Sequence, residues 1–215
     1  MNLSPSQKKQ IGAVLIIFVL ISIYGSRRSW LPVPDNTTYH DVDLSFTYPR
    51  TYHLDEYGID IASLGKPFGD TFTPLVEVVR YENDPDEKLP ATYLDFIKKQ
   101  AMNLCGSDGS IESITCTKVD AKPFVSSKGL HGQQLSLTLV RKNLITATST
   151  NSQYGPIYVF NTTPQPVKGE TFGFRSIFVY PSLGAFVDGT SSPELLQNVV
   201  DTIMIPAKVM STIGE

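Results

Sequence analysis

Short stretches in which apolar and polar residues alternate recur along this chain of 215 residues. In residues 43–49, DLSFTYP, the apolar Leu44, Phe46 and Tyr48 alternate with polar residues until Pro49, as in a half-buried β-strand. Similar patterns predict strands in residues 58–64, 74–81, 133–140, 155–160 and 173–180. Short alternating runs of this kind favour an antiparallel sheet.

A helical period of apolar residues appears first in residues 91–104, ATYLDFIKKQAMNL. Thr92 and Asp95 can form a capping box at its start. The apolar face expected to pack on the sheet consists of Leu94, Ile97, Ala101 and Leu104.

A second helix is predicted in residues 191–206, with Ser192 as its cap and Pro193 in the first helical position. Its buried stripe is expected to be Leu195, Leu196, Val199, Val200 and Ile203. Strands, one helix, a long antiparallel stretch and a closing helix therefore predict an α+β domain, an antiparallel β-sheet flanked by helices.

The longest uninterrupted apolar run, residues 11–24, is 14 residues long and is bracketed by basic residues. A helix over residues 10–26 would be about 25 Å long, enough for a short membrane span. No pair of small residues suited to signal peptidase precedes Arg27, so we favour one retained N-terminal transmembrane helix over a cleaved signal peptide. The expected organisation is a tail and membrane anchor in residues 1–30, a linker in 31–40, the domain in 41–208 and a tail in 209–215.

The two cysteines, Cys105 and Cys116, are separated by a polar Gly/Ser/Asp turn, which favours a local disulfide over two unrelated buried thiols. A disulfide would place the domain in an oxidising space. The expected localisation is therefore a cell membrane, crossed once, with the C-terminal domain extracytoplasmic.

The net charge of −3 is unevenly distributed, because residues 1–30 contain four basic residues and no acidic one. Residues 31–215 therefore carry 14 basic and 21 acidic side chains. A nucleic acid partner would need a basic stripe with aromatic residues, so we expect no nucleic acid binding.

Four segments, DLSFTYPRTYHL, ATYLDFIKKQ, GLHGQQLSLTLV and SPELLQNVVDTIMI, are similar to the PsbP-like family over residues 41–206. The resemblance implies the Mog1/PsbP-type fold, a central antiparallel sheet flanked by helices. It also implies a non-enzymatic, extracytoplasmic protein that binds or assists a membrane protein complex. The family has no catalytic residue to assign to this chain.

No G-x-S-x-G turn and no Gly-rich phosphate loop occurs in the sequence, so neither a hydrolase nor a nucleotide site is expected. The candidates for a metal site are His40, Asp43, His53 and Asp55, which lie in two acidic segments. A solvated surface is the interpretation we favour for these four residues, and no cofactor is expected.

These observations predict a membrane-anchored, non-enzymatic extracytoplasmic binding or assembly module. The alternative is a secreted ligand-binding or metal-binding protein released by signal-peptide cleavage. An enzyme ranks third.

Overall fold

A computed structural model describes residues 35–56, 61–68, 71–83, 90–108, 112–163 and 173–206. The predicted membrane segment, residues 11–24, and the predicted C-terminal tail lie outside the described residues. The chain divides into two compact units, Met1–Asp35 and Asn36–Glu215, and the second unit is described below.

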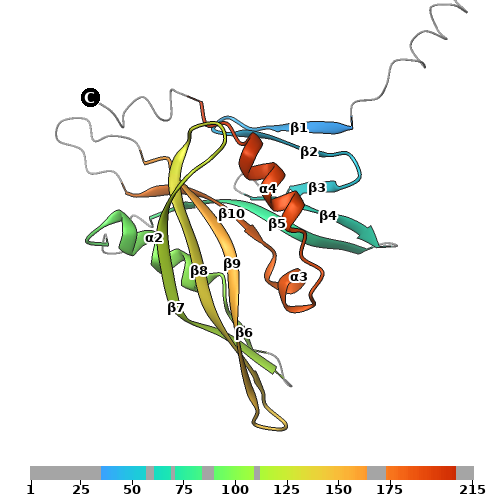
Figure 1. Cartoon of the computed structure of the whole chain (residues 1–215), viewed down its shortest axis with the longest axis vertical. Helices are drawn as coiled ribbons and strands as arrows, with labels where there is room; N and C mark the ends of the chain where they lie inside the picture. The colour runs from blue at the N-terminus through green and yellow to red at the C-terminus, as the bar shows by residue number, and fades with distance from the viewer. Residues whose placement is uncertain are drawn as a thin grey trace, which may run out of the picture. The chain divides into compact units, whose positions relative to one another are not determined.

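The centre of this unit is an antiparallel sheet of eight strands in the order β3-β4-β5-β10-β9-β8-β7-β6 (Figure 1). The strands span β3 His53–Glu56, β4 Ile61–Phe68, β5 Thr71–Glu82, β6 Ser107–Asp108, β7 Glu112–Val125, β8 His131–Asn143, β9 Ser149–Asn161 and β10 Arg175–Pro181. Strands β7, β8 and β9 are long and twisted, and the β8–β9 hairpin extends beyond the other strands (Figure 1).

A separate two-stranded sheet consists of β1, Asn36–His40, and β2, Ser45–Pro49. Residues 36–40, which were expected in the linker, form β1. The turn of this hairpin is joined to the large sheet by Arg80 of β5, whose Nη2 lies 2.8 Å from Oδ2 of Asp41.

The helices in the described ranges are α2, Tyr93–Asn103, α3, Leu183–Val187, and α4, Pro193–Thr202. Thr92 caps α2 by accepting a hydrogen bond from the Asp95 N–H at 3.1 Å, as the sequence predicted. Ser192 accepts from the Leu195 N–H at 3.4 Å at the start of α4. The predicted stripe of α4 is confirmed, since each of its side chains is buried.

The predicted apolar face of α2 is confirmed at Ile97 and Ala101, whereas Phe96 is buried in place of Leu94. Leu94 is 38% exposed, whereas Phe96, Ile97 and Ala101 are fully buried. The reason is that Phe96 enters an aromatic group with Phe174, at a ring distance of 5.7 Å, and this partner is far away in the sequence.

Two apolar cores lie on opposite faces of the sheet. The α4 cluster joins α4 and β2 to one face, and the α2 cluster joins α2 to the other. Strand β10 contributes to both, because Ile177 and Val179 enter the α4 cluster while Phe178 and Tyr180 enter the α2 cluster.

The expected α+β class is wrong. Of the described residues, 56% lie in strands and 18% in helices, so the domain is mostly β. The sequence pattern underestimated the strands because β7 and the first half of β9 carry Ser, Thr, Asn and Lys on both faces. These residues hide the alternation on which the prediction depended.

The expected single-pass anchoring at a cell membrane is also corrected. Among the described residues, no helix is long and apolar enough to cross a bilayer. The longest, α2, has 11 residues, against about 20 for a span.

Candidate functional site

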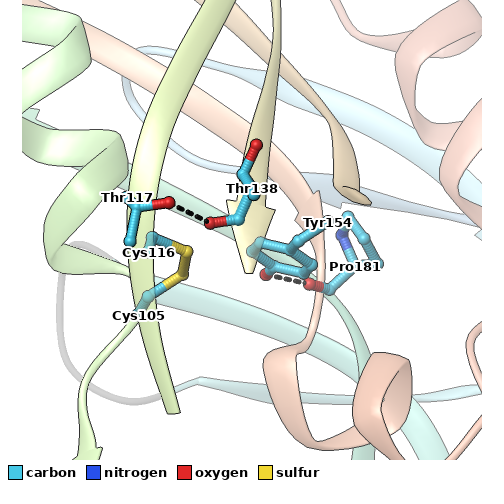
Figure 2. Close-up of a disulfide and its surroundings, with 6 residues drawn as sticks. All are labelled: Cys105, Cys116, Thr117, Thr138, Tyr154 and Pro181. Atoms are coloured by element: carbon cyan, nitrogen blue, oxygen red, sulfur yellow. Dashed lines mark hydrogen bonds between the residues drawn. A yellow bond between two sulfur atoms is a disulfide. The ribbon is translucent and has the colours of Figure 1, made fainter. Parts of the chain in front are cut away.

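The predicted disulfide is confirmed, because Cys105 and Cys116 are bonded with their Cα atoms 5.6 Å apart. Figure 2 shows that it joins the segment after α2 to strand β7. Both cysteines contact the α2 cluster, and Cys116 is 8% exposed. The bond therefore fixes the end of α2 on the sheet.

The four metal candidates do not come together. His40 ends β1 and Asp43 lies in the following turn, whereas His53 and Asp55 lie on β3 at the edge of the large sheet. Asp43 Oδ2 is 3.3 Å from Arg80 Nη2, so its carboxylate neutralises an arginine. Within the described ranges, no group of three or more His, Cys, Asp or Glu residues is placed to hold a metal ion.

Two tyrosine hydroxyl groups donate hydrogen bonds inside the α2 cluster. Tyr154 donates to the carbonyl oxygen of Pro181 at 2.5 Å, as Figure 2 shows. Tyr180 donates to Oε2 of Glu77 at 2.9 Å. Burial raises the pKa of both tyrosines, which stay neutral and act as structural donors.

The tip of the β8–β9 hairpin is an ordered turn. The Asn143 N–H donates to the Thr148 carbonyl oxygen at 2.9 Å and closes the turn. The Asn143 Oδ1 atom accepts from the N–H groups of Ile145 and Thr146, both at 2.9 Å. Ala147 has a positive φ of 54°, which completes the reversal of the chain. Three hydrogen bonds, each of which involves Asn143, therefore stabilise this turn.

This ordered turn presents two aliphatic side chains to solvent. Leu144 is 46% exposed and Ile145 is 75% exposed. All residues from 144 to 153 are exposed, so this end of the hairpin has no core of its own. Leu144 and Ile145 lie in the turn beyond the last strand pair, Lys142–Ser149, so neither face of the sheet covers them.

A small polar pocket of about 260 Å³ lies at the base of the turn. It is lined by Glu112, Arg141, Asn143, Thr148 and Thr150. The Glu112 carboxylate forms an ion pair with the Arg141 guanidinium. The hydrogen bond to Glu112 raises the pKa of Arg141, and the charge of Asp188 raises it further.

We call Leu144, Ile145, Arg141 and Glu112 together the tip surface. Sequence analysis missed it. Its signal was the apolar pair Leu144–Ile145 between Asn143 and Thr146, inside an otherwise polar stretch. The exposure of this pair could not be predicted without the β8–β9 register, which places both residues in the turn.

A scan against protein-family models and a search of curated proteins find no match. The PsbP-like resemblance therefore stays a prediction from sequence pattern. The tip surface combines two exposed aliphatic side chains with an ion pair.

Proposed function

We propose that this domain is a non-enzymatic binding module that docks a protein partner through the tip surface. The observation that carries the proposal is the exposure of Ile145, 75%, and Leu144, 46%, on a turn held by side-chain hydrogen bonds. Full burial of an aliphatic side chain contributes about 1.5–3 kcal/mol. Two such side chains can act as the apolar anchors of an interface.

The turn is ordered before a partner arrives, which favours binding. Asn143 bonds two backbone N–H groups, and the hydroxyl oxygens of Thr146 and Thr148 are 2.8 Å apart. A loop that is already fixed loses little conformational entropy on association. The adjacent Arg141 and Glu112 provide both signs of charge for orienting the partner.

Capture of a small ligand fits the same surface less well. Ligand pockets usually enclose about 300–1,000 Å³ with mostly apolar lining. The pocket at the base of the turn has about 260 Å³ and is lined by polar and charged residues. Its Arg141 is engaged by Glu112, so the pair serves better as part of a contact surface than as a receptor for a free anion.

The disulfide supports an oxidising compartment as the place of work, because such bonds persist where thiols are not kept reduced. The PsbP-like resemblance supports the same class of function, since members of that family act by binding. The resemblance therefore favours contact over catalysis.

The test is crosslinking in intact cells with the double variant Leu144→Ser/Ile145→Ser. A matched control is Val42→Ser/Met204→Ser, which removes two other exposed apolar side chains, 86% and 51% exposed, outside the hairpin. We expect the tip variant to lose at least about tenfold in the yield of a specific crosslinked partner. The control should keep the wild-type yield, and both variants should unfold at the wild-type temperature. Equal capture of the same partner by the tip variant would overturn the proposal.

A further inference from the structure

Strand β7 has one free edge. On one side it pairs with β8 from Glu112 to Val125, with a register shift at Thr117. On the other side β6 pairs only with Ser113 and Ile114. Within the described ranges no strand pairs with residues 117–125 on this side. A long unpaired edge is a template for another strand.

The backbone groups that point outward can be identified from the β7–β8 turn. The Ser126 N–H donates to the Leu130 carbonyl oxygen at 2.9 Å. Hydrogen-bonded positions alternate along an antiparallel pair, so the even-numbered residues 118–124 bond to β8. The outward groups therefore belong to Val119, Ala121 and Pro123. Pro123 fits this assignment, because it has no N–H and none is needed toward β8.

Ala121 is the middle residue of the free stretch, residues 117–125. The side chains of this stretch are exposed except those of Val119 and Phe124, which are half-buried. The small Ala121 side chain offers no obstacle to a second backbone at the centre. The residues of β7 that enter the α2 cluster are Ile114, Cys116 and Val119, so the helix does not cover the centre.

We propose that this edge pairs with the same edge of a second copy of this chain, forming a two-fold symmetric dimer with a continuous sheet. Ala121 lies opposite Ala121 of the second copy and exchanges two hydrogen bonds with it. Val119 lies opposite Pro123 of the second copy, whose carbonyl oxygen accepts from the Val119 N–H but which has no N–H to donate in return. Asp120 then lies opposite Lys122 of the second copy, and symmetry repeats this ion pair.

The charges of β7 favour the register centred on Ala121 over the one centred on Asp120. In an antiparallel pair the non-hydrogen-bonded positions have the closest side chains, with Cα atoms about 4.5 Å apart. Asp120 and Lys122 occupy such positions, and opposite charges there are stabilising. Within its own chain Asp120 also forms an exposed ion pair with Lys118, Nζ to Oδ1 2.9 Å, so its carboxylate would be shared between the two lysines. Centring the pair on Asp120 instead would place Lys118 opposite Lys122 of the second copy, which is repulsive. Centring it on Val119 would bring the second copy against β6 at Ser113 and Ile114.

Measurement of the molar mass of the full, disulfide-bonded chain by light scattering tests the dimer. We expect twice the chain mass of 23.7 kDa. The variant Ala121→Pro removes only an outward N–H and keeps the bonds to β8, so it should be a monomer with the wild-type circular dichroism. A monomeric wild-type chain, or a dimer that persists in the folded Ala121→Pro variant, would contradict the proposal.

A charge-reversal cycle tests the register without a backbone change. Asp120→Lys and Lys122→Asp should each weaken dimerisation about tenfold, because each creates two like-charge contacts. The double variant Asp120→Lys/Lys122→Asp should regain most of the affinity. Lys128→Asp, an equal charge change in the exposed β7–β8 turn, should leave it unchanged. Failure of the double variant to recover would exclude this register.

The variant Ala121→Cys gives a covalent readout. Cα atoms of a hydrogen-bonded antiparallel pair are about 5.5 Å apart, which suits a disulfide. Mild oxidation should produce a reducible dimer of Ala121→Cys and none of Ser152→Cys, an exposed position on β9. Equal crosslinking of the two variants would show random collision and overturn the pairing.

Discussion

Buried hydroxyl groups set the response of this protein to alkaline solution. The hydroxyl oxygens of Tyr93 and Ser176 are 2.8 Å apart, which ties α2 to β10. Tyr154 is fully buried and Tyr180 is 5% exposed. Burial holds the pKa of each of these three tyrosines well above 10.0. The phenols therefore remain neutral in the folded protein at pH values where exposed tyrosines ionise.

The free energy of unfolding should accordingly fall above about pH 10. In that range the unfolded chain loses a proton from each tyrosine and the folded chain does not, so ionisation favours unfolding. The loss amounts to about 1.4 kcal/mol per pH unit for each buried tyrosine, and there is no loss from this source below the unfolded pKa. Denaturant unfolding across this range, with tyrosinate absorbance as a second probe, measures it. Stability that stays constant to about pH 11 would contradict the burial of these hydroxyl groups.

At the scale of elements, the disulfide is expected to stabilise the contact between α2 and β7. The double variant Cys105→Ser/Cys116→Ser reopens a loop whose ends are 11 residues apart. By loop entropy the loss is about 3 kcal/mol of unfolding free energy. Denaturant unfolding of both proteins, with and without reductant, measures it. Reductant should destabilise only the wild type, and equal sensitivity of the double variant would contradict a role for this bond.

Elements with their signals inside one segment were predictable, and those that depend on distant partners were not. The cap and stripe of α4 require only residues 191–206, and the structure confirms them. Strand β7 escaped prediction because most side chains of residues 117–125 are exposed, and among the described strands only β8 pairs with these residues. The choice of Phe96 over Leu94 on α2 likewise depends on Phe174, which only the fold brings close.

The same distinction applies to the sites. The disulfide could be predicted because both cysteines flank one local turn. The metal candidates were inferred from acidic segments, but the topology puts His40 on the two-stranded sheet and His53 on the edge strand β3. The tip surface needed the pairing of Arg141 with Thr150, which defines where the hairpin turns. The spacing of residues in the sequence does not predict which residues of β8 and β9 pair.

At the scale of the whole molecule, the two apolar clusters share strands, because β9 and β10 contribute side chains to both. In β9, Tyr158 and Phe160 enter the α4 cluster, whereas Ile157 and Val159 enter the α2 cluster. Displacement of β9 or β10 would therefore remove side chains from both clusters at once. The unit Asn36–Glu215 should therefore unfold in one transition.

Truncation of one side chain in each cluster tests this coupling. Phe96→Ala in the α2 cluster should cost about 3–5 kcal/mol and Leu196→Ala in the α4 cluster about 2–5 kcal/mol, because both side chains are buried. Each variant should shift one denaturant transition, seen alike by far-ultraviolet and near-ultraviolet circular dichroism, with an unchanged m-value. Leu94→Ala, at a position that is 38% exposed, is the control and should cost less than about 1 kcal/mol. A variant with two separated transitions, only one of them displaced, would show that the clusters unfold independently despite the strands they share.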